Sequence, residues 1–575
     1  MRLGVAQSFL ESSLAGISPQ IQASHEPDSL DLGAQQCACC CRCGRGRELK
    51  PTGLRVKRKS RSYSPIRTGV SELSGWLVEP PSLNGASDAR LPTDNAPGES
   101  SLERLPVEIL NRIITELTTD IPPAGNGPRN VDLSACLLTS RTIHVATLPI
   151  LYRFITIPHS NIFSKFLGHI SKYPNLGKLA RRLDLSHFTS LGLGRTNEQN
   201  NAIQNMSSKT LLACLNLTPA LQEVLFQYHL ENDIDGDVIR KLFFGHSNLR
   251  ALDFCGSWSQ NFVTAFSSVC SSPIFLRTSV LEIRRLSLHE CSTLPSSTLE
   301  LLLPRLPKLT HLDLCHTKVS DKALASIPRS AKLTHLNLSR CSQMTGDGVV
   351  DFLTDNPAVA NLVYLNLCCD TKTYRLLSET NIDRLLPLLP DTLRSLNLGG
   401  ARIRASHRSR LLPLTKHLEE LGLGFADLSM SDLNSLFIPR PPKDDLEGIS
   451  YEELAWTPST LHYLDLTGVP SVTISGLFSS TCVLLEPLTS PLEVLELSDK
   501  IIAGLNKCTA TNKQLGWCVK ELGKRGWYVR EPTAETVGRS TARPWKMGAM
   551  WWGMRKIPVA HAEVGGPYGH YMFKK

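Results

Sequence analysis

The chain lacks the long apolar runs that cross a membrane. No window of its 575 residues reaches 18 consecutive apolar residues, the length at which a transmembrane helix becomes a candidate. The first residues, MRLGVAQSFLESSLAG, hold a single arginine and only short apolar patches, so they make a poor secretory signal. We therefore expect no membrane partner, and a location in the cytoplasm, the nucleus or both.

Catalytic motifs are also missing. The sequence contains no G-x-x-x-x-G-K-[ST], no G-x-G-x-x-G after a strand, no H-E-x-x-H and no G-x-S-x-G. These are the spacings that cradle phosphates, bind dinucleotides, hold zinc or present a serine nucleophile. Isolated histidines such as His289 and His316 are expected on the surface or in turns. We predict a non-catalytic protein with no catalytic residue, no metal and no cofactor.

The charge does not by itself indicate a nucleic-acid-binding protein, and the cysteine content argues against a disulfide-bonded one. The 62 Lys and Arg residues against 53 Asp and Glu leave a net charge of +9, and positive charge must cluster on one face to bind phosphates. Nucleic acid is therefore not an expected partner, although the basic run at 55–61 leaves a chromatin-associated role open. The 17 cysteines are odd in number and scattered, which favours free thiols in a reducing compartment.

Residues 1–98 are predicted to be disordered, because they are rich in Ser, Pro, Gly and Gln and show no sustained period. The Cys37–Cys43 cluster has C-x-x-C spacings but no second paired set of ligands. Zinc binding and thiol acylation stay open for it, and no specific role is the main expectation. The run RVKRKSR at 55–61 is a candidate nuclear localisation signal or simply solvated charge, and Ser64 precedes Pro65 as a candidate phosphorylation site.

A helical module is predicted over residues 99–157. Apolar residues at 109, 110, 113, 114 and 117 form one stripe of an amphipathic helix. Pro106 suits its first turn, and the Pro/Gly-rich stretch 121–130 ends it. Asp132 can cap a second helix, and a third short helix ends near Pro149–Tyr152.

From residue 158 to 510 the motif L-x-x-L-x-L recurs, with LTHLDL (309–314), LTHLNL (333–338) and LVYLNL (362–367) among the best copies. The second leucine of successive copies is separated by 24 residues (Leu312 to Leu336) at the shortest and 43 (Leu421 to Leu464) at the longest. The shorter intervals match a leucine-rich repeat, and the longer ones require loop insertions. Since alternate strand residues face opposite sides, the leucines build the core and the residues beside them face the concave side. The fold class is α/β, a horseshoe solenoid with a parallel sheet on its concave face.

The segment 511–575 holds five of the eight tryptophans, at positions 517, 527, 545, 551 and 552. Disordered tails are poor in aromatic residues. We predict that this segment packs as a cap over the last repeat or forms a Trp-rich tail. Cys341, in the repeat LNLSRCSQMTGDGV, is expected to fill a turn as a small buried residue rather than act as a nucleophile or ligand.

The residues of the helical module resemble an F-box. Its opening pattern Leu-Pro-x-Glu-Ile-Leu is matched by Leu105, Pro106 and Glu108–Leu110, its Ser-Arg by Ser140 and Arg141, and its closing Pro-x-Leu-aromatic by Pro149–Tyr152. The chain departs from the pattern in its long inner loop and in the missing aromatic after Arg141. The repeats resemble the cysteine-containing leucine-rich subtype, and the whole layout is similar to fungal F-box/leucine-rich-repeat proteins.

This resemblance implies a substrate receptor of a cullin–RING (SCF-type) ubiquitin ligase, whose F-box docks on a Skp-type adaptor while the repeats bind an unknown protein substrate. The residues expected to bind the adaptor are Leu105, Pro106, Ile109, Leu110, Ile113, Ile114, Leu117, Leu138, Leu148, Leu151 and Tyr152. The residues expected on the concave face to bind the substrate are His311, Asp313, His335, Asn337, Tyr364, Asn366, Asn397, Glu420, Tyr463 and Asp465. Two alternatives stay open, a binding scaffold that acts without ubiquitin transfer and a helical module that merely caps the solenoid.

Overall fold

The computed structural model describes residues 100–119, 130–157, 160–186, 206–277, 280–369, 371, 375–438, 457–522, 525–531 and 547. The Cys37–Cys43 cluster, the basic run 55–61, Ser64 and the tryptophans at 545, 551 and 552 lie outside this part of the chain. Among the helices that the structure describes, none combines the length and apolar character that a bilayer crossing requires.

Three helices precede the first strand: α2 (Val107–Thr119), α3 (Asn130–Cys136) and α4 (Arg141–Arg153). Pro106 stands just before α2, as predicted, and Ser140 caps α4 by accepting a hydrogen bond from the Ile143 amide at 3.3 Å. One sequence expectation is wrong in detail, because Asp132 lies inside the first turn of α3 rather than at its cap. The helix α4 ends at Arg153, one residue beyond the predicted end near 149–152.

Fourteen strands of the described chain form one sheet in the order of the sequence, except that β14 precedes β13 at the far edge. The strands from β1 to β12 are parallel, and β14 pairs antiparallel with β12. Their bounds are β1 (Phe154–Thr156), β2 (Arg182–Asp184), β3 (Glu223–Leu225), β4 (Ala251–Asp253), β5 (Arg285–Ser287), β6 (His311–Asp313), β7 (His335–Asn337), β8 (Tyr364–Asn366), β9 (Ser395–Asn397), β10 (Glu420–Gly422), β11 (Tyr463–Asp465), β12 (Val494–Glu496), β13 (Trp517–Leu522) and β14 (Arg525–Arg530).

The predicted repeat is confirmed residue by residue in the strand register. Leu312 pairs with Leu336, and Leu336 with Leu365, so the second leucine of each motif lies beside that of the next. Sequence reasoning missed β1, which follows α4 directly, and the β13–β14 hairpin. Both segments lack the L-x-x-L-x-L motif that identified the other strands.

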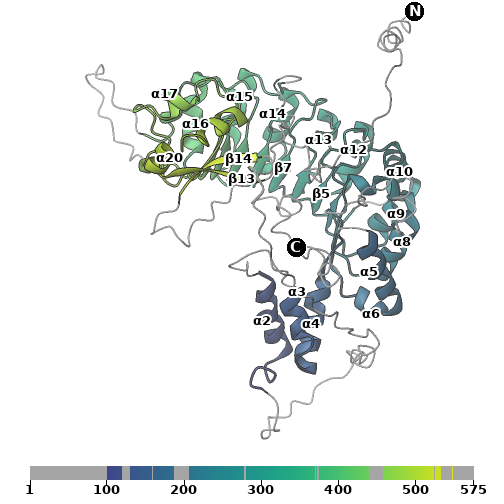
Figure 1. Ribbon diagram of the computed structural model, residues 1–575. Helices are drawn as coiled ribbons and strands as arrows, with labels where there is room; N and C mark the ends of the chain where they lie inside the picture. The colour runs from purple at the N-terminus through teal and green to yellow at the C-terminus, as the bar shows by residue number, and fades with distance from the viewer. Residues whose placement is uncertain are drawn as a thin grey trace, which may run out of the picture.

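Each repeat returns through helices, which lie along the outer side of the arc while the strands line its inner side (Figure 1). The α-helices are α5 (Ser160–Lys172), α6 (Pro174–Gly177), α8 (Ser208–Leu217), α9 (Gly236–Phe244), α10 (Gln260–Cys270), α11 (Pro273–Arg277), α12 (Ser296–Leu302), α13 (Asp321–Ala325), α14 (Gly346–Asp355), α15 (Glu379–Leu385), α16 (Arg408–Leu414), α17 (Met430–Asn434), α18 (Ile474–Leu477), α19 (Asp499–Leu505) and α20 (Thr509–Leu515). Short 3₁₀ turns occupy η2 (Tyr228–Asp233), η3 (Leu303–Arg305), η4 (Pro357–Val359), η5 (Leu386–Leu388), η6 (Ala405–His407) and η7 (Pro487–Thr489).

Many of these helices start where a hydroxyl side chain satisfies a free amide. Ser320 accepts a hydrogen bond from the Ala323 amide at 3.2 Å before α13, and Thr345 accepts one from Gly348 at 3.0 Å before α14. Such caps stabilise a helix by about 1 kcal/mol. Because α13 has only five residues, its cap and the burial of Leu324 matter more than intrinsic helix propensity.

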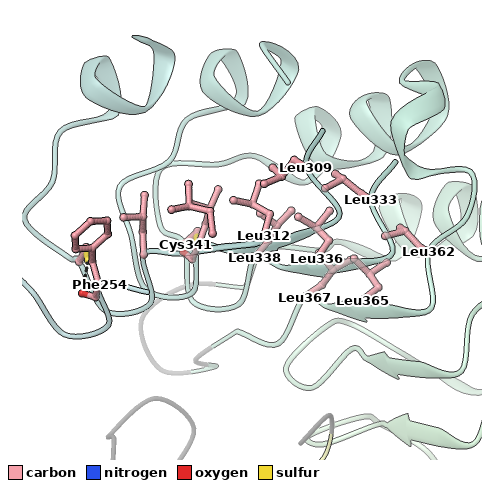
Figure 2. Packing of buried hydrophobic residues seen from close by; sticks show 14 of the residues in the cluster. Phe254, Leu309, Leu312, Leu333, Leu336, Leu338, Cys341, Leu362, Leu365 and Leu367 are labelled. Atoms are coloured by element: carbon pink, nitrogen blue, oxygen red, sulfur yellow. Dashed lines mark hydrogen bonds between the residues drawn. The ribbon is translucent and has the colours of Figure 1, made fainter. Parts of the chain in front are cut away.

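The core is a stack of leucines between the sheet and the helices, as the repeat predicts. Leu309, Leu312, Leu333, Leu336 and Leu362 lie in adjoining layers in Figure 2, and all are buried. In the loops after β4 to β7 and β9 to β11 the backbone turns through a left-handed residue, four positions after the central strand residue. Glycine occupies this position at 256, 400 and 468, and it is Glu290, His316, Arg340 and Phe425 in other repeats, all with positive φ.

Cys341 fills such a loop, as expected. Its side chain is 2% exposed, and its thiol donates to the Leu314 carbonyl at 2.9 Å. Burial raises the pKa of the Cys341 thiol to about 12. At neutral pH it therefore stays protonated, which suits packing rather than nucleophilic chemistry.

The hairpin closes the sheet after the last repeat. Because β14 pairs with β12, the β12 edge is not left open to another chain. Trp517 and Tyr528 are fully buried, the Trp517 indole donates to the Leu485 carbonyl at 3.0 Å, and the Tyr528 hydroxyl donates to Asn512 at 2.9 Å. Trp517 and Trp527 thus pack against the solenoid end.

Candidate protein-binding surfaces

The first helix, α2, has one buried and one exposed apolar side. Leu110 and Ile114 are 1% and 4% exposed and join the core with residues of α4. Ile109, Ile113 and Leu117 are 46%, 42% and 40% exposed. Their spacing of four residues places them along one side of the helix, and we call these three residues the α2 stripe.

The residues predicted to bind an adaptor therefore divide by burial. Leu110, Ile114, Leu151 and Tyr152 are core residues, and Leu105 and Leu148 are partly buried against that core. Pro106, Ile109, Ile113, Leu117 and Leu138 are exposed, Leu138 most of all at 79%. Only the exposed members can touch a partner directly, while the buried ones hold α2 and α4 together.

Sequence reasoning missed three further exposed apolar residues in or beside the helices of the module, and Phe154 at the start of β1. Leu102 and Val107 flank the start of α2, and Val145 lies on α4 with 61% of its side chain exposed. Leu102 precedes Pro106 by four positions, a spacing that could have placed it beside the stripe. The exposure of Val145 could not be predicted, because the sequence of its helix does not show which side is buried.

On the concave face, the last residue of many strands holds the following loop. The side-chain oxygen Oδ1 of Asp313 accepts the Cys315 amide at 3.0 Å, and that of Asn337 accepts the Ser339 amide at 3.2 Å. The same contact recurs two residues along from Asn366, Asn397 and Asp465, at 3.0, 2.9 and 2.8 Å. These five predicted substrate contacts thus have a structural task, since a short polar side chain closes the turn.

The first residue of each strand forms a second row along the same face. The His311 and His335 rings stack with centroids 3.9 Å apart, and Tyr364 continues the row 6.0 Å from His335. Burial, followed by the nearby charges of His335 and Arg285, lowers the pKa of His311 to about 3. The imidazole is therefore neutral at physiological pH.

Further along this row the polar groups bind one another. The Ser395 hydroxyl donates to Glu420 at 2.6 Å, and the Trp527 indole donates to the Tyr463 hydroxyl at 2.9 Å. The Tyr463 hydroxyl in turn donates to Glu496. Glu420 and Tyr463 are buried, as are His335 and Tyr364. Of the ten predicted residues, His311, Asn397 and Asp465 keep partial exposure.

One cluster in the described chain combines nitrogen, oxygen and sulfur groups. His289 Nδ1 lies 3.2 Å from both carboxylate oxygens of Asp313, and these groups and the Cys315 thiol lie within 4.8 Å of one another. Such a set could in principle ligate zinc. The Asp313 carboxylate already accepts the Cys315 amide and the His289 ring, however, so the cluster is explained as a buried polar network. His289 was expected on the surface or in a turn, and the structure places it in a turn but buried.

A cavity of about 220 Å³ opens beside α9, away from the strands' concave residues. Phe243, Phe244 and Val280 are among its lining residues, together with His246. Burial lowers the pKa of His246 to about 4, with a smaller contribution from Lys241. Ser247 and Glu282 also line the cavity, so its wall combines apolar side chains with polar groups.

Part of the chain is similar in sequence to a known protein. No model of a protein family matches the chain. Over 278 residues, or 45% of this chain, the sequence is 28% identical to the F-box protein YLR352W of Saccharomyces cerevisiae. The chain is therefore similar to an F-box protein over part of its length. It spans about a third (34%) of the length of this relative.

The arrangement from α2 to β1 shows how the helical module is attached to the sheet. The motif residues Leu105 and Pro106 stand at the start of α2, and Tyr152 lies at the end of α4, directly before β1. The helical module therefore joins the first strand of the sheet without a linker. Among solved structures, a chain from the crystal structure of the Rad7 and Elc1 complex in yeast is 14% identical, with a TM-score of 0.30, over 64% of this chain and 84% of that chain.

Proposed function

We propose that the protein is a non-catalytic substrate receptor of an SCF-type ubiquitin ligase. In this proposal the F-box (99–157) binds a Skp-type adaptor and through it a cullin–RING ligase. The solenoid (158–510) binds the target protein, and the segment 511–575 caps the solenoid or continues as a tail. The observation that carries the proposal is the exposed α2 stripe, in a chain that is similar over part of its length to an F-box protein.

The stripe has the chemistry of a protein interface. Ile109, Ile113 and Leu117 expose between 40% and 46% of their side chains. Completing their burial would contribute roughly 1 kcal/mol for each residue, about half the gain for a fully exposed aliphatic side chain. Monomeric proteins seldom leave such side chains aligned along one helix without a partner.

The direct junction of α4 and β1 supports a role in positioning. Arg153 ends α4 and Phe154 begins β1, and Ile155 and Ile157 after it are fully buried in the common core. A partner held on α2 is thereby fixed relative to the concave face by a packed core rather than by a flexible linker. Such a rigid connection is what a receptor needs to present a target to a distant enzyme.

The test is affinity purification of the wild-type chain beside a Leu105→Ala/Pro106→Ala variant, with identification of the bound proteins. We expect the Skp-type adaptor with the wild type and its loss with the variant, while solenoid partners remain. Retention of the adaptor by the variant would contradict the proposed interface. If deletion of 101–157 left the levels and ubiquitylation of solenoid partners unchanged, the chain would be a scaffold instead of a ligase receptor.

A further inference from the structure

Met547 is buried by strands that lie well before it in the sequence. It is 5% exposed and packs with Tyr463, Val494, Trp527 and Val529. These residues belong to β11, β12 and β14, at the last strands of the sheet. Met547 follows Arg530, the end of β14, by 17 residues in the sequence, so the chain returns to this end of the solenoid.

Met547 lies on the concave side of the sheet. The central residues of β11 and β12, Leu464 and Leu495, belong to the main core between sheet and helices. Their strand neighbours Tyr463 and Val494 point to the opposite side, because side chains alternate along a strand. These two residues form a separate cluster with Met547, on the face that a horseshoe solenoid uses for recognition.

The surface under Met547 is apolar even though it contains two polar aromatic residues. The Trp527 indole nitrogen donates to the Tyr463 hydroxyl at 2.9 Å, and that hydroxyl donates to Glu496. The two hydroxyl and indole groups are thus hydrogen-bonded, and the side chains of Tyr463, Trp527 and Val494 pack with Met547. A methionine fits such a surface, since its thioether is flexible and packs well against aromatic rings.

A missing side chain opens the space in which Met547 sits. Most strands end in Asp, Asn or another polar residue, as in Asn397 of β9 and Asp465 of β11, whereas β10 ends in Gly422. A Cβ atom added at Gly422 would lie 3.1 Å from the Met547 sulfur and 2.6 Å from Asn397 Oδ1. We call the surface formed by Gly422, Tyr463, Val494, Trp527 and Val529 the methionine seat.

The seat is built entirely from the repeats and the hairpin, so it exists without Met547. An intramolecular side chain also occupies such a seat at a high effective concentration, which a competing ligand must overcome. We propose that the methionine seat is the anchor site of the solenoid for an apolar side chain of a target segment, and that Met547 occupies it as an internal competitor. This inference rests on the proposed function only in that the target is a protein bound by the solenoid.

The test uses a fluorescent peptide of residues 540–552 and the full-length chain, with fluorescence anisotropy as the readout. The Met547→Asp chain leaves the seat vacant, and we expect it to bind the peptide at least tenfold more tightly than the wild-type chain. The Met547→Ala chain should behave in the same way, which guards against a folding defect caused by the aspartate. Equal affinity of the wild-type and both variant chains would overturn the proposal.

Two matched controls locate the binding at the seat. A peptide carrying Met547→Asp should bind the vacant chain at least tenfold more weakly than one carrying Met550→Asp. Adding Val494→Asp to the Met547→Ala chain should abolish peptide binding. The Tm of this double variant should stay within a few degrees of that of the Met547→Ala chain. Binding that ignores either change would contradict the seat. None of these measurements involves the adaptor, so failure here and failure of the ligase proposal are separate results.

Discussion

The imidazole of His311 lies flat on that of His335, with 3.9 Å between the ring centroids and 8° between the ring planes. The two residues occupy the same position in successive repeats and are paired in the strand register. Each ring also lies 2.9 Å from the hydroxyl of the threonine before it, Thr310 or Thr334. The repeat of the sequence thus becomes a stack of identical side chains on the concave face.

The first prediction concerns the pH dependence of stability. The pKa of His311 is lowered to about 3 by burial in the folded chain, whereas an unfolded histidine has a pKa of about 6.5. The unfolded state therefore takes up the proton first as the pH falls, so the contribution to stability is complete above about pH 6.5 and declines towards pH 3. The urea midpoint should fall between pH 7.5 and pH 5.

The variant His311→Gln isolates this effect, because glutamine does not titrate. Its urea midpoint should depend less on pH over the same interval than that of the wild type. His246, with a pKa lowered to about 4, contributes in the same direction and remains in both proteins. An unchanged slope in the variant would show that His311 is not buried in its neutral form.

A second prediction concerns Gly468. Its φ of +72° is left-handed, and an added Cβ would lie 2.4 Å from the Phe425 ring. Gly468→Ala should lower the free energy of unfolding by more than the roughly 1–2 kcal/mol that the left-handed backbone alone costs a side chain. Chemical denaturation of the purified variant measures this loss.

Gly168 is the matched control for that substitution. It lies inside α5, and an added Cβ meets nothing within 4 Å. Gly168→Ala should therefore stabilise the chain by up to about 1 kcal/mol, the usual gain in helix propensity. If both alanine variants changed stability equally, the loop geometry of the repeats would be wrong.

A third prediction concerns thiol reactivity. The thiols of Cys214, Cys270 and Cys341 are buried, and burial raises the pKa of each to about 12. They should resist iodoacetamide at pH 8 in the folded protein and react after denaturation, because only the thiolate is a nucleophile. Cys136, which is partly exposed, serves as the internal comparison. Mass spectrometry showing Cys341 and Cys136 alkylated at the same rate without denaturant would contradict the packing of the loops.

The sequence was enough to predict the solenoid and its register. Leucines 312, 336 and 365 were identified from one motif, and they pair with one another in the sheet. The motif carries this information because its spacing encodes both the inward face of a strand and the repeat period. The first strand was not predictable in the same way, since Phe154–Thr156 is a three-residue segment at the end of a helix.

The burial of the candidate site could not be predicted. The alternation of side chains along a strand predicts that Asp313 and Tyr364 point away from the leucine core. It does not predict that both are only 1% exposed on the other face of the sheet. Nor does it distinguish a residue that binds a partner from one that closes the next turn, as Asp313 does for Cys315. In α2 the stripe was visible, whereas the division between buried Ile114 and exposed Ile113 depends on how α4 packs against it.

The central claim is that the exposed side of α2 binds an adaptor, and a binding measurement on Ile113→Asp tests it most directly. Isothermal titration of the full-length chain with a purified Skp-type adaptor should show at least tenfold weaker binding, or about 1.4 kcal/mol, because the aspartate places a charge in an apolar interface. Arg112→Asp, at the neighbouring exposed position, introduces the same residue beside the stripe and should bind within about threefold of the wild type. Wild-type affinity in Ile113→Asp would contradict the account.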